Sequence, residues 1–321
     1  MRPRRLPHVL LAVLLTAVAV AATACGTGST PDASGSGGSF PRTIKHAMGT
    51  TEIPTRPKRV VVLDTGELDD VTLLGIKPVG AVSPHMKTHG GFPDYLTSMT
   101  KHTKDVGPMA EPNLDLIASL APDLILSSKI RHEKIYDKLS EIAPTVFTEN
   151  TGVTWKDNLK VHARALGLED RAAAAMKKYE RRAARLGRAI DKANGGTMPS
   201  VSVVRFLAGP TRLYQKASFS GVILSDVGVK RPESQDVDGF ALEVGPEEID
   251  KADADIVFVT VADDPDKTQK KDAQDNPLWK EMRAVKRHKV FDVSDEIWMS
   301  GIGVQAANLV LDDLAERTGV R

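Results

Sequence analysis

The sequence predicts an α/β fold in which two doubly wound lobes are joined by one long α-helix and a ligand cleft lies between the lobes. Short β-branched runs alternate with helical segments within residues 46–154 and again within residues 197–321. This is the pattern of a mainly parallel sheet covered by helices on both faces. The two halves also resemble each other weakly across a helical segment at residues 155–196, as two lobes of one kind would.

The first half, the expected N-terminal lobe, begins with a β-branched run at residues 59–63. Asp64 suits a helix N-terminus, and apolar residues at helical spacing follow it as far as Gly75. Further elements are predicted as strands at residues 78–82, 124–126 and 145–147 and as helices at residues 114–120 and 133–142.

The bridging segment, residues 155–196, predicts two helices. The first covers residues 155–166 and ends at Gly167, and the second covers residues 169–193, about 37 Å at the usual rise of an α-helix. The second has an apolar stripe on one face and several lysines and arginines on the other. A solvated surface explains the basic face better than a binding patch does.

The second half, the expected C-terminal lobe, repeats this order with a strand at residues 201–206, a helix at 221–227 and a strand at 256–259. The internal similarity is clearest before the strands that follow Asp123 and Asp255. Asp115 and Glu247 each lie eight residues before these aspartates, so the two acids occupy matching positions.

The N-terminus has the layout of a secretory signal, with arginines before an apolar run at residues 9–22 and small residues before Cys25. The run is shorter than the roughly 20 residues that cross a bilayer, so a permanent transmembrane helix is not expected. A cysteine at this point resembles a bacterial lipobox. We therefore expect a lipoprotein signal peptide at residues 1–24, lipidation of Cys25, and a flexible Gly/Ser-rich tether at residues 25–45.

Charge and cysteine content narrow the range of partners. The net charge is +1, and it becomes slightly negative when the three arginines of the leader are removed, which argues against a nucleic-acid partner. Cys25 is the only cysteine, so no disulfide forms within the chain. The protein is expected to act as a monomer on the outer face of the cytoplasmic membrane.

Several motifs resemble the iron-siderophore substrate-binding proteins of ABC importers, over roughly residues 40–320. They are RPKRVVVL at residues 56–63, LGIKPVG at 74–80, the segment 113–125, and the C-terminal segment 291–303. Within this family, residues 203–232 are similar to actinobacterial lipoproteins that bind ferrioxamine-type hydroxamate siderophores. The resemblance implies the class III periplasmic-binding-protein fold, no enzyme activity and no cofactor. It also implies capture of a ferric hydroxamate siderophore and its delivery to an ABC permease.

The candidate ligand-binding residues follow from this fold, because open α/β sheets bind ligands outside the carboxyl ends of their strands. Arg205 and Arg131 are expected to donate hydrogen bonds to the oxygens of a chelate. Tyr214, Phe219 and Trp298 are the expected aromatic walls. The alternatives are surface positions for the arginines and core positions for the aromatics.

Asp115 and Glu247 are the expected permease-docking residues, since the resemblance implies one carboxylate on each lobe that contacts arginines of the permease. The family usually has glutamate in the first lobe, so Glu111 or Glu248 is a possible substitute. The alternative is that both acids only stabilise helix N-termini.

Other functions have less support in the sequence. Binding of haem, cobalamin or zinc is the alternative within the binding class, but no metal site is predicted because HExxH motifs and paired cysteines are absent from the sequence. A lipid-anchored hydrolase would need a G-x-S-x-G elbow, which the sequence also lacks.

Overall fold

The computed structural model describes residues 38–83, 91–262 and 264–320. Cys25, the predicted leader and most of the predicted tether lie outside these residues. In the described ranges, every helix is too short or too polar to cross a lipid bilayer. The expected tether was wrong at its C-terminal end, because strand β1 (Arg42–His46) pairs in antiparallel register with β2 (Gly49–Ile53).

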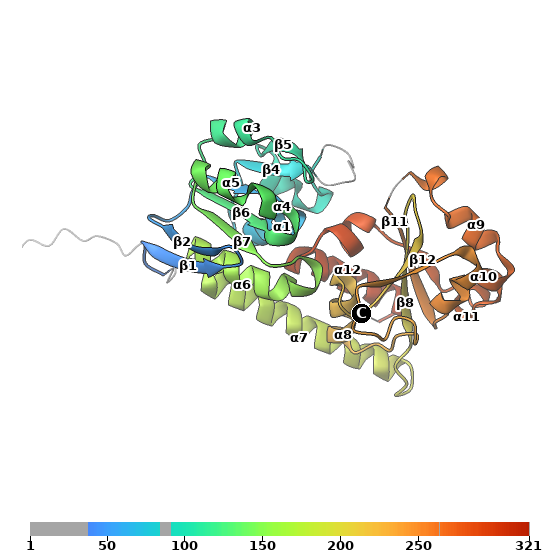
Figure 1. The fold of residues 1–321 in the computed structure, drawn as a ribbon. Coiled ribbons are helices and arrows are strands. Elements are labelled where there is room, and N and C mark those ends of the chain that lie inside the picture. The colour runs from blue at the N-terminus through green and yellow to red at the C-terminus, as the bar shows by residue number, and fades with distance from the viewer. Residues whose placement is uncertain (1–37, 84–90, 263, 321) are drawn as a thin grey trace, which may run out of the picture. The chain divides into compact units, whose positions relative to one another are not determined.

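The first sheet has five parallel strands in the order β5-β4-β3-β6-β7, a doubly wound arrangement (Figure 1). Its strands are β3 (Val60–Val62), β4 (Gly80–Ser83), β5 (Lys104–Pro108), β6 (Leu124–Ser128) and β7 (Thr145–Thr148). Its helical segments are α1 (Thr65–Leu73), η1 (Asp94–Leu96), α2 (Thr97–Thr100), α3 (Leu114–Ser119), α4 (Lys129–His132), η2 (Glu133–Ile135) and α5 (Tyr136–Ile142).

Alternation along the central strands divides the side chains between two cores. Val60 and Val62 pack with residues of α1 and the bridging helices, whereas Val61 packs with Ile117 of α3 and Leu139 of α5. Successive side chains of a strand point to opposite faces, so a fully apolar strand is buried on both. This explains why these short runs are continuously β-branched.

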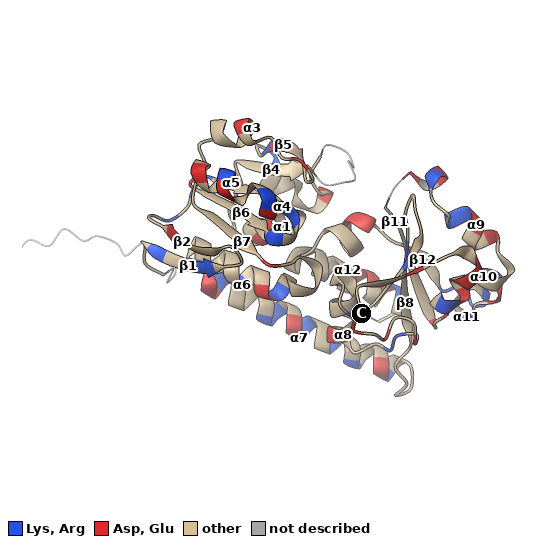
Figure 2. Cartoon of the chain, viewed as in Figure 1, with Lys and Arg blue, Asp and Glu red and all other residues tan. Residues whose placement is uncertain are grey.

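The bridging helices have the predicted bounds. After η3 (Gly152–Thr154), α6 (Trp155–Leu166) ends at Gly167 in left-handed backbone, and α7 (Glu169–Ala193) follows. The surface of α7 carries acidic as well as basic residues, among them Glu180 and Asp191 (Figure 2). Gly187 on the buried face allows α8 (Phe219–Val227) to approach closely, since a Cβ there would lie 2.0 Å from the Val227 carbonyl oxygen.

The second sheet is mixed, in the order β10-β9-β8-β11-β12. Strands β8 (Val201–Phe206), β11 (Ile256–Val261) and β12 (Val290–Asp292) are parallel, whereas β9 (Thr211–Tyr214) runs antiparallel to both β8 and β10 (Ala241–Val244). The sequence analysis did not predict β9 or β10. The remaining helical segments are η4 (Pro246–Ala252), η5 (Pro265–Lys267), α9 (Lys270–Asp275), α10 (Pro277–Glu281), α11 (Arg283–Lys286), the π-helix η6 (Glu296–Ser300) and α12 (Val304–Thr318).

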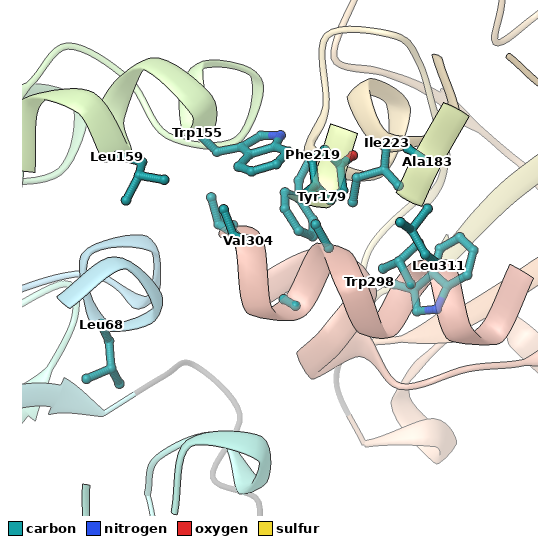
Figure 3. Close-up of a cluster of buried hydrophobic side chains, with 14 of the residues drawn as sticks. Leu68, Trp155, Leu159, Tyr179, Ala183, Phe219, Ile223, Trp298, Val304 and Leu311 are labelled. Atoms are coloured by element: carbon teal, nitrogen blue, oxygen red, sulfur yellow. The ribbon is translucent and has the colours of Figure 1, made fainter. Parts of the chain in front are cut away.

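One hydrophobic cluster connects the two sheets. It contains Val60 and Val62 of the first sheet, Val201 and Val203 of the second, and Tyr179 of α7. Figure 3 shows the part of this cluster in which Trp155, Tyr179 and Phe219 meet, with Trp298 beside Leu311 of α12. Full burial of each large apolar side chain contributes about 1.5–3 kcal/mol. The two sheets therefore share part of their stabilising core.

Candidate ligand-binding cleft

A cleft of about 500 Å³ lies where the carboxyl ends of strands from both sheets meet. From the first sheet, residues that follow β3, β6 and β7 line it, and from the second, residues that follow β8 and β11. These residues are Thr65, Arg131, Thr151, Leu207 and Ala262. The expected position of the site is the one that open α/β sheets use.

Arg205 at the end of β8 is held by a buried carboxylate. Its Nε and Nη2 donate to the two carboxylate oxygens of Asp295, each at 2.7 Å, and its Nη1 donates to the Tyr214 hydroxyl at 3.0 Å. Burial opposes the charged guanidinium, but Asp295 and Tyr214 outweigh it and raise the pKa of Arg205. Arg205 is therefore charged and fixed in one orientation in the cleft wall.

Arg212 is the directly opposed cross-strand partner of Arg205. Its Nε donates to Glu243 Oε1 at 3.0 Å, and it also hydrogen-bonds with Tyr214. Like charges placed opposite each other on two strands are destabilising unless other groups compensate for them. The tyrosine hydroxyl and the two carboxylates provide that compensation.

The aromatic wall beside these arginines is formed by Tyr214, Phe219 and Phe240. The Phe240 ring meets the Tyr214 ring edge-on at 5.2 Å, and Phe240 is 55% exposed. Phe219 begins α8 and packs edge-on against Trp155 at 5.8 Å. An exposed phenylalanine at a cleft mouth is available to contact a ligand.

Arg131 occupies the first-lobe side of the cleft. Its Nε donates to Asp64 Oδ2 at 2.8 Å, and Asp64 also caps α1 by accepting from the Thr65 backbone N–H. Burial opposes the charge of Arg131, but Asp64 raises its pKa overall. The neighbouring His132 fixes the short helix α4 by bonding to Ser127 and to the Met109 carbonyl, each at 2.7 Å.

Trp298 does not line the cleft, which corrects the expectation for this residue. Its ring is fully buried and stacks on Phe258 at 4.4 Å, and its Nε1 donates to Asp313 at 2.7 Å. The next residues, Met299 and Ser300, line the cleft instead. The indole of Trp298 instead packs toward α12.

Arg212 and Phe240 were missed because the antiparallel pair β9 and β10, which are connected through α8, was not predicted. Residues 211–214, Thr-Arg-Leu-Tyr, offered only a weak signal, since apolar and polar residues do not alternate along them as they do in a half-buried strand. Asp295 was also missed, and its signal was weaker, because a lone aspartate before a helix is common.

The described residues do not support hydrolase chemistry at this site. The Ser127 hydroxyl lies 2.7 Å from His132 Nδ1, but both side chains are buried and His132 Nε2 donates to a backbone carbonyl. The serine therefore lacks the access that a nucleophile needs. Within the described ranges, no cluster of three His, Cys, Asp or Glu side chains is arranged to hold a metal ion.

A hollow of about 630 Å³ on α6 and α7 is larger than the cleft. Its floor is formed by small or apolar residues such as Ala163, Ala172 and Met176. The cleft is the better candidate site, because buried charged groups with fixed geometry converge there.

Asp115 and Glu247 lie at matching places in the two halves. Asp115 is in the first turn of α3 and Glu247 in the first turn of η4, and both side chains are exposed. Of the two named substitutes, Glu111 is exposed and Glu248 pairs with Lys251. The structure therefore leaves both acids accessible to a partner.

Comparison with known proteins agrees with this fold. The chain is 41% identical over 319 residues to the probable siderophore-binding lipoprotein YfiY of Bacillus subtilis (strain 168), with 95% of this chain and 96% of the relative covered. Staphylococcus aureus SirA, solved in complex with staphyloferrin B, superposes with a TM-score of 0.80 at 37% identity, covering 87% of this chain and 99% of SirA. The triscatecholate siderophore binding protein FeuA of Bacillus subtilis, complexed with Ferri-Bacillibactin, gives 0.72 at 25% identity, with 87% and 98% covered.

Residues 60–297 match the family described as periplasmic binding protein. The fold expected from the sequence motifs, with two sheets and a long connecting helix, is confirmed. The expectation of a binding protein rather than an enzyme is confirmed as well. This chain belongs to the periplasmic binding protein family.

Proposed function

We propose that this protein binds a ferric siderophore in the cleft and delivers it to an ABC importer. The observation that carries the proposal is the row of Arg205, Tyr214 and Arg212 in one wall, with Arg131 on the first-lobe side. Guanidinium groups supply hydrogen-bond donors for the oxygens of a chelate, and aromatic side chains cover its apolar parts.

The charge balance of the cleft favours a hydroxamate over a highly anionic chelate. Each of the three arginines has a carboxylate partner: Asp295 for Arg205, Glu243 for Arg212 and Asp64 for Arg131. The paired groups keep N–H donors but carry little net charge. A ferric hydroxamate presents polar oxygens with little net charge, so it suits this lining.

A fluorescence titration tests both the binding of a ferric siderophore and the preference for a hydroxamate. Trp155 contacts Phe219 of the cleft wall, so a ligand should change the tryptophan emission. The panel consists of ferrioxamine B, ferric dicitrate, a ferric catecholate, haem, cobalamin and zinc. Tightest binding of ferrioxamine B supports the hydroxamate preference. Tightest binding of another ferric siderophore would contradict that preference but leave siderophore binding itself supported. Binding of haem, cobalamin or zinc without any siderophore would overturn the proposal.

Delivery to the importer is proposed to use Asp115 and Glu247. Their exposure at matching sites on the two halves supports docking to a partner with two similar subunits. Glu247→Lys should leave siderophore affinity unchanged and reduce cellular iron uptake. Glu141→Lys is the matched control, since Glu141 is also exposed and acidic. Equal uptake by the two variants would remove Glu247 from the docking surface.

The proposed location is the outer face of the cytoplasmic membrane, with a lipid on Cys25 and the protein acting as a monomer. The leader pattern before Cys25 supports the anchor. Cys25→Ala should release the protein from membranes in cell fractionation. Retention of this variant in the membrane fraction would contradict the anchor, and a dimer in light scattering would contradict the monomer.

A further inference from the structure

A small polar chamber lies beside the cleft, between α1 and α6. It has a volume of about 10 Å³, which is room for about one water molecule. Two of its lining residues, Thr151 and Ile302, also line the cleft. Glu67 and Asp70 of α1 and Trp155 and His162 of α6 contribute side chains with hydrogen-bonding groups to its lining.

Four polar atoms of these side chains lack a hydrogen-bond partner among the described residues. Each of the four residues is at most 2% exposed, so these side chains are shielded from bulk water. Leaving a buried polar group unpaired costs free energy, and such groups in native proteins are usually paired with protein or with ordered water. The four atoms are Glu67 Oε2, Asp70 Oδ1, Trp155 Nε1 and His162 Nε2.

The protonation of the chamber determines which atoms are donors. Burial raises the pKa of Asp70 well above its ordinary value and lowers the pKa of His162, so both shifts favour a neutral carboxyl beside a neutral imidazole. His162 Nδ1 lies 2.7 Å from Asp70 Oδ2, so the neutral carboxyl donates to it. The ring proton of His162 is then on Nε2. The chamber therefore presents two N–H donors, from His162 and Trp155, and carboxyl oxygens of Asp70 and Glu67 as acceptors.

We propose that the chamber is a binding site for one internal water molecule that accepts from the two N–H groups and donates to the two carboxyl oxygens. Water has two donors and two acceptors, so it satisfies all four atoms at once. A cation would be repelled by the N–H groups and an anion by the carboxyl oxygens. His162 Nε2 and Glu67 Oε1 are 4.0 Å apart, too far for a direct hydrogen bond but suited to a bridging water. The water would tie α1 to α6 beside the cleft.

Nuclear magnetic resonance of the ligand-free ¹⁵N-labelled protein tests the site without any siderophore. The Trp155 indole proton should show a cross-peak to a long-lived water. Trp298 is the internal control, because its indole already donates to Asp313 and should show none. The variant Trp155→Phe lacks this indole, so the resonance that disappears from its spectrum is the one of Trp155. Absence of the cross-peak from the wild-type Trp155 indole would overturn the proposal.

A variant and a crystal structure distinguish water from other occupants. Glu67→Met removes the carboxyl group at similar size, and it should abolish the Trp155 cross-peak while leaving the Trp298 signal unchanged. Persistence of the cross-peak in a folded Glu67→Met protein would contradict the proposed contacts. A high-resolution crystal structure of the wild type, which does not depend on the variant folding, should show one water within hydrogen-bond distance of all four atoms. An empty chamber or a bound ion would refute the water site.

Discussion

At the residue scale, the cleft wall contains two arginines placed opposite each other, an arrangement that by itself lowers the stability of the sheet. Arg205 and Arg212 face each other across two strands, and their charges are tolerated because Asp295, Glu243 and Tyr214 surround them. A guanidinium has five N–H donors, and Arg205 uses three of them within the protein. A pair of like charges that costs stability is expected at a functional site, where the charges are needed to bind a ligand.

Arg205→Ala should weaken ferrioxamine B binding by about 1–3 kcal/mol, the range for hydrogen bonds that involve a charged group. The loss comes from the missing donors and from Asp295, which remains buried without its partner. Tryptophan fluorescence titration measures the change. Arg181→Ala on the exposed face of α7 is the matched control and should leave the affinity unchanged. An Arg205→Ala curve that coincides with the wild-type curve would exclude Arg205 from the site.

Part of the cleft could be predicted from the sequence, since four of the five candidate residues, Arg131, Arg205, Tyr214 and Phe219, line it. They were found because they follow or lie near predicted strands, and strand ends fix the location of such a site. Trp298 could not be placed in the same way. Whether an indole next to a cleft faces ligand or core depends on packing with Phe258 and Asp313, which are distant in sequence.

At the element scale, helix α1 connects the two halves through its acidic side chains. Asp69 accepts from the backbone N–H groups of Gln305 and Ala306, each at 3.0 Å, at the N-terminus of α12. The Tyr95 hydroxyl donates to the same carboxylate at 3.1 Å. A side chain of the first half therefore caps a helix of the second half.

Asp69→Ala should lower the free energy of unfolding by about 2 kcal/mol or more, because caps contribute up to about 2 kcal/mol and the buried donors lose their acceptor. Urea denaturation measures the change. Asp157→Ala, at an exposed residue of α6 paired with Lys160, is the control and should change stability by less than about 0.5 kcal/mol. Equal effects of the two substitutions would show that the cap does not stabilise the fold.

The pH dependence of stability should report the buried acids of α1. Burial raises the pKa of Glu67 from 4.5 to about 7, so the folded protein holds a proton that the unfolded chain releases above pH 4.5. Its contribution is greatest below pH 4.5 and is lost as the pH rises to about 7, a change of about 3 kcal/mol. Asp69, whose pKa is raised to about 7 mainly by burial, acts in the same direction. His162, whose pKa is lowered by burial, acts in the opposite one.

The substitution Glu67→Gln isolates the contribution of Glu67 to the pH dependence of stability. The stability difference between wild type and variant, measured by urea denaturation at several pH values, should decrease between pH 4.5 and 7 and stay constant above pH 7. A difference that does not vary with pH would contradict the raised pKa of Glu67.

The bridging helices were predicted better than strands β9 and β10. The bounds of α6 and α7 follow from a long apolar periodicity and from Gly167, which are local signals. Strands β9 and β10 are short, helix α8 lies between them in the chain, and their pairing depends on residues about 30 positions apart. A short segment of this kind carries too little periodic signal to be identified alone.

At the scale of the whole molecule, the shared core limits movement between the two halves. Residues of both sheets, α7 and α12 belong to one hydrophobic cluster, and α12 also packs against α1. Opening the halves widely would expose this apolar surface to water, which is unfavourable. The cleft is therefore expected to be largely preformed.

Small-angle X-ray scattering should show almost no change in the radius of gyration when ferrioxamine B binds. The physical reason is that a hinge movement would have to separate the packed faces of α1, α7 and α12. The unliganded protein at the same concentration is the reference. A clear compaction on binding would show that the halves rotate and that the core is not a rigid link.

The most direct test of the account is to locate the iron. Crystals of the protein with ferrioxamine B, measured at the iron absorption edge, should show one anomalous peak in the cleft, between Arg131 on one wall and the Arg205–Tyr214–Arg212 row on the other. A peak elsewhere, for example in the hollow on α6 and α7, would contradict the assignment of the cleft as the binding site.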